Sequence, residues 1–342
     1  MLVGICTHYH RCENTHIACR IAGAASHYGG DAVFYTDQDR HPPIDPAYDA
    51  HVTLSSRQPF KDWARACTHV IWTSVPLLSD LQWAADQGKH TVIVPNWHEL
   101  RSAHRKVLHA AGTVICTNRT ASDMLIRKWK LSRCIPAGWD PGLPIVRKRG
   151  PHDPTRPRLF YPLEMITPHN QPSILFMLRR LLNDTSATLS VAYTPSRIDS
   201  QTRRHLEGLE DRFGERVKLL QRLSLHAMAA QFAVHDLTLW PSRMDNAAVG
   251  ALMSAYSGTP VLAFNTSPIN EFLHASTLVP CNYRHGPLGN ASAVVNYPDY
   301  NATLGHLLER PDALQQTYVD TTHLLGERSR NFERAWRLVF EN

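Results

Sequence analysis

The chain has 342 residues, 43% hydrophobic and 19% charged, with a formal net charge of +6. This composition is typical of a globular protein and excludes a disordered chain, and no apolar run approaches the ~18 residues that a membrane helix needs. The length is natural for two domains.

Short apolar strands alternate with helices through the first part of the chain. Gly29 and Gly30 end the first helix, as is typical of helix C-termini. Repeated strand–helix–strand units predict a parallel sheet. We expect strands at 2–6, 31–36, 68–75, 89–96, 113–117 and 134–138, and helices at 15–30, 77–88, 99–112 and 118–130.

Residues 139–158 contain five prolines and two glycines and predict a linker. Beyond it we expect strands at 158–163, 187–194, 216–221, 235–242 and 260–265, and helices at 173–184, 200–214 and from about Asn246. The predicted fold is α/β, with two doubly wound Rossmann-like domains that face a cleft. The ligands of such sheets bind at the carboxyl ends of strands.

We place an N-terminal domain at 1–150, a C-terminal domain at 151–325 and a helix at 326–342 that packs back on the N-terminal domain. The seven cysteines form no CxxC pair, and the N-terminus MLVGICTHYH lacks the basic start and long apolar stretch of a signal peptide. These features predict reduced thiols and a cytoplasmic protein of a bacterium or a phage-infected host.

The stretch PSRMDNAAVGALMSAYSGTPV, from Pro241 to Val261, follows a predicted strand and contains a predicted helix start. Backbone N–H groups at a helix start bind anions such as a diphosphate. Asp245 precedes that start and can accept hydrogen bonds from sugar hydroxyls, while Ala247 and Ala248 are small enough to let a phosphate approach. The alternative is an ordinary turn and core helix.

The longer segment HDLTLWPSRMDNAAVGALMSAYSGTPVLAFNTSPINEF resembles the donor site of GT-B glycosyltransferases of the family 4 type. That family shows Pro-Ser, then Glu, seven residues, a second Glu, a Gly-Thr/Val-Pro-Val strand and a later Glu. Asp245, Met253 and Glu271 stand at these three Glu positions. The segments CIPAGWDP, RLFYPLEMITPHNQPSILFML and NYPDYNATLGHLLERPDAL are similar to further parts of the family, so the resemblance covers nearly the whole chain.

The resemblance implies hexosyl or pentosyl transfer from a nucleotide-sugar, a UDP-sugar, with retention of configuration and without a required cofactor or metal. It assigns catalytic roles to His98 and Asp245. Met253 departs from the pattern because its thioether is a weak acceptor that cannot hold the donor ribose. An inactive sugar- or nucleic-acid-binding relic is therefore an alternative. The resemblance assigns donor binding to His169, Asn170, Arg243, Asn246, Ala247, Ala248, Met253 and Glu271.

His98 follows an apolar strand, where it either hydrogen-bonds a sugar hydroxyl or caps the next helix. The loop THYHRCENTH follows the first strand, and we expect acceptor contacts there. His8, His10, Cys12 and His16 do not have the spacing of a tetrahedral zinc site, and residues 37–39 (DQD) predict a solvated loop. The acceptor residues predicted in the first loop are His8, Tyr9, Arg11 and Asn14.

From Arg101 to Arg158 the chain has thirteen Lys or Arg and three Asp, a net charge of +10. This excess indicates an anionic partner, with a solvated basic face as the alternative. One hypothesis is DNA carrying hydroxymethylcytosine, the substrate of phage-type DNA glycosyltransferases, bound through Arg127, Lys128 and Lys130 with flipping of the base. Trp97, Trp129 and Trp139 interleave this basic segment.

A second hypothesis is a polysaccharide or glycolipid acceptor at an anionic membrane surface, which requires a peripheral basic helix with large exposed apolar residues. The predicted helix at 99–112 instead has an ordinary core face, formed by Leu100, Ala103, Val107, Ala110 and Ala111. This pattern favours DNA.

Overall fold

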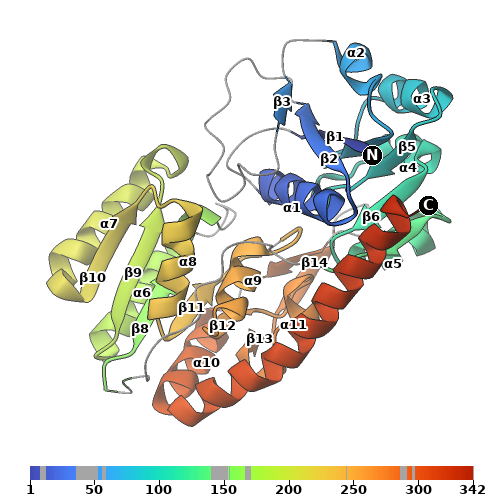
Figure 1. Ribbon diagram of the computed structural model, residues 1–342. Helices are drawn as coiled ribbons and strands as arrows, with labels where there is room; N and C mark the ends of the chain where they lie inside the picture. Colours follow the sequence, from blue (N-terminus) through green and yellow to red (C-terminus); the bar gives the residue numbers. More distant parts are fainter. Residues whose placement is uncertain are drawn as a thin grey trace. The chain divides into compact units, whose positions relative to one another are not determined.

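The computed structural model describes residues 1–7, 13–35, 53–55, 59–139, 153, 155–165, 171–243, 245–285, 291–294 and 297–341. They belong to two compact units (Figure 1). The first unit comprises Met1–Gly142, His285–Asn290 and Glu327–Asn342, and the second comprises Leu143–Arg284 and Ala291–Gly326.

The first unit is built on a parallel sheet with the strand order β3-β2-β1-β4-β5-β6-β7. β1 pairs with both β2 and β4, so the strand order reverses there. In doubly wound sheets ligands bind outside the carboxyl ends of strands at such a reversal. The strands are β1 Leu2–Cys6, β2 Asp31–Tyr35, β3 Thr53–Ser55, β4 His69–Trp72, β5 His90–Ile93, β6 Thr113–Cys116 and β7 Cys134–Pro136.

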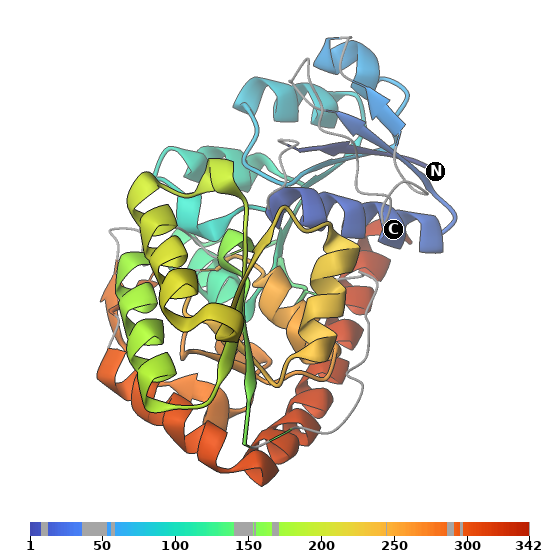
Figure 2. The ribbon, with the colours of Figure 1, turned by 90° about the vertical axis from the view of Figure 1, so that its left-hand side faces the viewer.

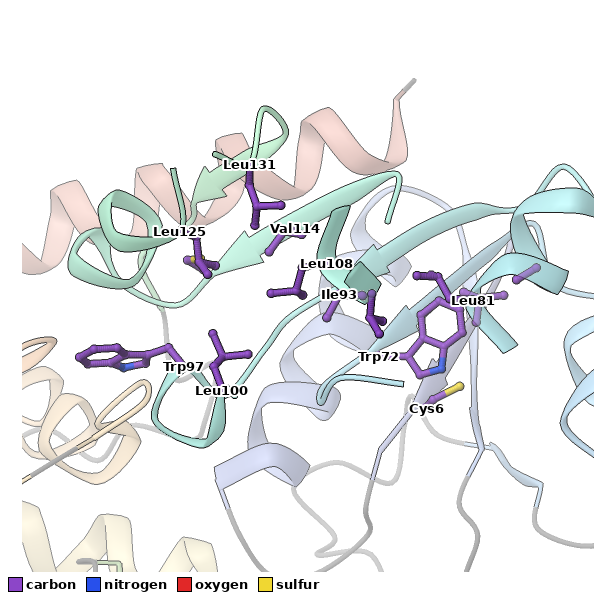
Figure 3. Close-up of a cluster of buried hydrophobic side chains, with 14 of the residues drawn as sticks. Cys6, Trp72, Leu81, Ile93, Trp97, Leu100, Leu108, Val114, Leu125 and Leu131 are labelled. Atoms are coloured by element: carbon purple, nitrogen blue, oxygen red, sulfur yellow. The ribbon is translucent and has the colours of Figure 1, made fainter. Parts of the chain in front are cut away.

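Helices cover this sheet on both faces. On one face, α2 Phe60–Ala64, α3 Leu78–Asp86, α4 His104–Ala110 and α5 Arg119–Trp129 pack on a cluster that includes Trp72, Ile93 and Val114 (Figure 3). On the other, α1 Glu13–His27 packs against the end of α11 Pro311–Phe340, where the Arg20 guanidinium lies 4.6 Å from the Phe332 ring centroid. Successive side chains of a strand point to opposite faces, so these nearly continuous buried runs present apolar groups to both helical layers.

The second unit has a parallel sheet with the order β10-β9-β8-β11-β12-β13. Here the reversal is at β8, which pairs with β9 and β11. A separate two-stranded sheet joins β14 Asn282–His285 and β15 Ala291–Val294. The main strands are β8 Arg158–Tyr161, β9 Thr188–Tyr193, β10 Val217–Gln221, β11 Leu237–Trp240, β12 Val261–Phe264 and β13 Leu278–Val279.

Two helical layers also enclose this second sheet. Figure 2 shows α6 Gln171–Asp184 and α7 Ser200–Phe213 on one side and α8 Leu225–Val234 on the other. The ring of Phe160 packs on Phe232 of α8, with centroids 5.2 Å apart. Ser254 of α9 Val249–Tyr256 donates a hydrogen bond to Thr238 of β11. Helix α10, Tyr297–Glu309, contacts α6. Its Tyr300 hydroxyl donates a hydrogen bond to the Leu262 carbonyl of β12 at 3.0 Å.

The α/β fold with two doubly wound parallel sheets is confirmed. The helix predicted at 99–112 is wrong in extent, because Trp97–Glu99 forms a short 3-10 helix and α4 begins only at His104. Its predicted core face is correct for Leu100 and Val107, which are buried, and wrong for Ala103 and Ala110, which are exposed. The boundary expected after residue 325 lies within α11, which runs without a break from Pro311 to Phe340.

Candidate functional site

The loop between β11 and α9 lies at the carboxyl edge of the second sheet. It follows β11, which lies beside β8 where the strand order reverses, the position where doubly wound sheets bind ligands. Pro241 and Ser242 at its start are buried, and Arg243 is half-buried. His169 and Asn170, which were expected to contribute from the loop after β8, lie outside the described residues.

Asp245 is buried in this loop, with 7% of its surface exposed. The indole Nε1–H of Trp240 donates a hydrogen bond to its Oδ2 atom at 3.0 Å. A charged acceptor makes this bond stronger than one between neutral groups. The last residue of β11 therefore holds the carboxylate in a fixed place. Trp240 was not predicted as a site residue, although its place at a strand end, five residues before Asp245, could have indicated a contact with the carboxylate.

Trp240 also contacts the start of α9. A Cβ atom added at Gly250 would lie 2.6 Å from the Trp240 ring, closer than real Cβ contacts allow. Gly250 thus leaves room for the indole to approach the helix backbone closely. One side chain therefore joins the end of β11, the Asp245 carboxylate and the first turn of α9.

Helix α9 begins at Val249, three residues later than the predicted start near Asn246. Its N-cap, Ala248, has left-handed backbone angles of φ 51° and ψ 46° and provides no side-chain cap. A left-handed alanine is unfavourable by itself, and such strain is concentrated at functional sites. The first N–H groups of a helix have no acceptor within it, so this start can bind an anion. Asn246 and Ala247, just before the cap, are buried.

Met253 lies inside α9, with 1% of its surface exposed. Its carbonyl accepts hydrogen bonds from the Ser257 hydroxyl at 2.8 Å and the Ser257 N–H at 3.0 Å. The position that bears a carboxylate in the resembled family thus carries a buried thioether here. The later carboxylate of the pattern, Glu271, ends the short helix Ile269–Glu271 after β12, where it accepts a hydrogen bond from Ser267 at 3.0 Å.

His98 lies in the first unit, in the segment that follows the carboxyl end of β5. Its ring centroid is 4.0 Å from that of Trp97. The Asn96 side chain, rather than His98, caps the short helix by accepting the His98 backbone N–H at 3.3 Å. Since Ala103 is the N-cap residue of α4, His98 does not cap that helix either.

Most of the predicted acceptor loop lies outside the described residues. This applies to His8, Tyr9 and Arg11, and also to His10, Cys12 and residues 37–39. Asn14 is in the first turn of α1, but its side chain is not described. Within the described ranges, no group of three or more His, Cys, Asp or Glu side chains could hold a metal ion.

The basic residues on α5 are exposed. Arg127 and Lys128 lie in its last turn, and Lys130 is its left-handed C-cap residue. The three tryptophans that interleave the basic segment, Trp97, Trp129 and Trp139, are all buried and therefore do not support contacts to DNA bases. The Trp139 ring, for example, packs edge-on against Phe332 with centroids 5.1 Å apart. Among the described helices, none is both long and apolar enough to cross a membrane.

No protein-family model matches the chain, and no curated protein matches it in sequence. Solved structures do match it. A glycosyltransferase from Rickettsia africae has a TM-score of 0.73 at 10% identity, covering 100% of this chain and 99% of that one. The chain has the GT-B fold.

Two further structures with the GT-B fold match over nearly their whole length. Anabaena HepE in complex with UDP-glucose has a TM-score of 0.68 at 13% identity, covering 100% of this chain and 98% of that one. WaaG, a glycosyltransferase involved in lipopolysaccharide biosynthesis, has a TM-score of 0.62 at 13% identity, covering 98% of this chain and 99% of that one. Identities this low show the fold alone.

Proposed function

We propose that the protein is a glycosyltransferase that moves a sugar from a UDP-sugar to a hydroxyl acceptor. The observation that carries this proposal is the buried Asp245 carboxylate, which Trp240 fixes just before the start of α9, where the N-cap residue Ala248 provides no side-chain cap. The GT-B fold supports the reaction class, and the UDP-glucose bound to HepE supports a uridine diphosphate donor.

Each residue of the donor site has a distinct part in this proposal. The N–H groups at the start of α9, with Arg243, Asn246 and the small Ala247 and Ala248, stabilise the departing diphosphate. Asp245 and Glu271 orient the sugar, and His169 and Asn170 contact the phosphates. Because Met253 is buried and lacks a strong acceptor, the ribose is recognised by other groups.

The reaction proceeds with retention, through an oxocarbenium-like front-side step in which the departing phosphate takes the proton of the acceptor. His98 hydrogen-bonds a sugar hydroxyl near the developing charge. No metal or other cofactor is needed in this scheme, because protein groups stabilise the diphosphate. We expect the reaction to take place in the cytoplasm.

The acceptor is anionic in this proposal, and it is presented to Arg127, Lys128 and Lys130 on α5, with His8, Tyr9, Arg11 and Asn14 near the reacting hydroxyl. Hydroxymethylated DNA satisfies the charge requirement. A membrane glycolipid satisfies it too, and the 42% exposed Ile126, directly before Arg127 on α5, favours that alternative. The three tryptophans that interleave the basic segment are buried and lend no support to DNA.

A single assay tests the reaction class and the acceptor together. Labelled UDP-sugars would be supplied with hydroxymethylcytosine DNA, unmodified DNA and anionic vesicles that carry a glycolipid. We expect release of UDP and label on one acceptor. Label confined to the lipid fraction would end the DNA hypothesis, and the reverse would end the membrane one. If calorimetry detected no binding of any UDP-sugar, the protein would be the inactive relic and the donor-site proposal would be wrong.

A further inference from the structure

A cavity of about 640 Å³ lies in the first unit, at the amino ends of β5, β6 and β7. The segments that precede these three strands and the last turn of α11 form its walls. In a parallel sheet this edge is opposite the carboxyl edge, from which His98 follows β5. The cavity therefore has no part in the proposed sugar transfer. Its chemistry is set by Lys89, His90, His109, Ser132, Arg133 and Leu338.

The polar lining of the cavity is cationic. Lys89 and Arg133 are basic side chains, the imidazoles of His90 and His109 add ring nitrogens, and none of the lining residues is a carboxylate. Asp86 and Glu341 are the acidic residues nearest in sequence to the lining residues, but neither is part of the lining. Glu341 Oε1 instead lies 3.8 Å from Arg337 Nε. The cavity thus favours a negatively charged ligand.

Backbone carbonyls hold the basic groups in place. Lys89 Nζ donates to the Arg65 carbonyl at 2.7 Å, and His109 Nε2 donates to the Trp129 carbonyl at 2.8 Å. An ammonium has three N–H donors and a guanidinium has five, so each cation can donate further bonds to a ligand. Cations that are already ordered lose little conformational entropy when an anion binds.

The remaining lining gives the cavity an apolar side. Leu108 and Leu131 are buried in its wall, while Leu338 at its rim is 49% exposed. Two further lining residues are joined by a hydrogen bond, in which the Gly112 N–H donates to Thr91 Oγ1 at 2.9 Å. A Cβ atom at Gly112 would lie 3.0 Å from the Thr91 carbonyl oxygen, so only glycine fits there without a shift. The cavity therefore combines cations with apolar contacts, which suits an organic anion.

We propose that this cavity binds a phosphorylated small molecule. Its phosphate group is held by Lys89, Arg133 and the two imidazoles, and its organic part lies against Leu108, Leu131 and Leu338. Charge-assisted bonds to phosphate oxygens from an ammonium and a guanidinium supply the recognition. The inference does not depend on the proposed function, because it concerns the other edge of the first sheet.

The test uses the full chain and inorganic pyrophosphate as the probe, followed by hydrogen–deuterium exchange. We expect pyrophosphate to protect residues 85–92, 108–113 and 130–134 in the wild type. Lys89→Gln with Arg133→Gln should lose this protection and bind at least about tenfold more weakly, since hydrogen bonds to charged groups are strong. The matched control, Lys61→Gln with Arg179→Gln, removes two exposed cations elsewhere and should bind like the wild type.

A second variant guards against misfolding. Ala110→Trp places a large ring at an exposed lining position without changing any charge, and it should also abolish protection of the three segments. Equal protection in the wild type and the charge variant would overturn the proposal. Protection confined to residues 241–253 would overturn it too, while supporting diphosphate binding at the start of α9. No protection anywhere would contradict both the cavity proposal and the donor-site proposal.

Discussion

Trp240 and Asp245 are joined by a buried hydrogen bond of 3.0 Å from the indole Nε1–H to the carboxylate Oδ2. The same indole rests on the backbone of α9 at Gly250. The position of the carboxylate relative to the helix start is therefore set by a residue that ends a buried strand. This relationship separates two roles, because Trp240 positions the carboxylate while Asp245 itself faces the donor in the proposed reaction.

Replacement of Trp240 by Phe should weaken transfer while leaving the protein folded. The ring keeps most of its packing, but the hydrogen bond to Asp245 is lost, at a cost of about 1.5–3 kcal/mol for a bond to a charged group. We expect kcat to fall about tenfold or more. Steady-state kinetics with a UDP-sugar would measure this change.

The control is Trp336→Phe. The indole nitrogen of Trp336 is buried and has no hydrogen-bond partner in the described structure. The substitution thus removes the same N–H group without breaking a bond. If both variants lost activity to the same extent, a positioning role for Trp240 would be excluded.

Asp245→Asn should nearly abolish transfer. The amide keeps the shape of the carboxylate but loses its charge, and we expect a loss of about 2–4 kcal/mol of transition-state stabilisation. The ratio of kcat/KM between variant and wild type gives this quantity, and thermal unfolding would show that the fold remains. Activity within about twofold of the wild type would remove Asp245 from the site.

Met253→Glu distinguishes a cryptic ribose site from a core position. In the resembled family a glutamate there holds the ribose, so tighter nucleotide binding would be the gain expected from the motif alone. Met253 is 1% exposed, and a carboxylate there would be buried. We therefore expect destabilisation by about 3 kcal/mol or more, measured by urea unfolding. Met253→Leu, of similar volume, should cost less than about 1.5 kcal/mol.

The sequence was sufficient to predict most strands, because each is an apolar run between turn residues, and the two doubly wound sheets follow from their alternation with helices. It was not sufficient for α8, since LHAMAAQFAV is apolar on most sides and lacks the polar face that marks a surface helix. The five residues of α2 are likewise too few for a periodic pattern. Tertiary packing stabilises both.

The candidate site was predictable in location but not in detail. The Pro-Ser turn and the following helix indicate where Asp245 lies, yet its bond to Trp240 depends on how the loop returns to the strand. At Trp129, by contrast, a core residue was counted with the basic segment that suggested DNA. Ala121, Leu125 and Trp129 are spaced by four residues and are all buried, so helical periodicity alone predicts a core residue there.

Asp236 should be important for the stability of the second unit. Its fully buried carboxylate accepts hydrogen bonds from the Arg158 backbone N–H at 2.9 Å, from Nε at 3.0 Å and from Nη2 at 2.9 Å. These bonds raise the pKa of Arg158 and join the starts of β8 and β11. Asp236→Ala removes both acceptor oxygens, and with them all three bonds, and should cost about 2–3 kcal/mol of unfolding free energy, because the freed Arg158 side chain is 41% exposed and remains hydrated.

Asp184→Ala is the matched control in the same unit. Asp184 pairs with Arg180 on the surface of α6, at 3.8 Å and with both side chains largely exposed. Exposed pairs of this kind contribute about 0–1 kcal/mol. The urea-unfolding midpoints of the two variants should therefore differ clearly, and equal midpoints would show that the half-buried Arg158–Asp236 pair is no more important than a surface pair.

Stability should fall in mild acid because of His235. Burial lowers the pKa of this imidazole to about 4, and the positive charge of Arg158 acts in the same direction. Its Nδ1–H donates to the Gln231 carbonyl at 2.6 Å, so the neutral Nε2 accepts from the Ser190 hydroxyl at 2.9 Å. The folded protein therefore keeps His235 neutral where an unfolded chain, with a pKa near 6.5, would protonate it.

The sign follows from this difference in proton binding. Between pH 6.5 and pH 4 the unfolded chain binds more protons, so stability rises with pH in that window and is lost as the pH falls through it. His235 alone should lower the free energy of unfolding by about 2 kcal/mol when the pH falls from 7 to 5. Urea unfolding at both pH values would show the loss, and His235→Gln should reduce it by about that amount. His226→Gln, an exposed histidine on α8, should leave the loss as in the wild type. An undiminished loss in the His235 variant would place the acid sensitivity in other groups.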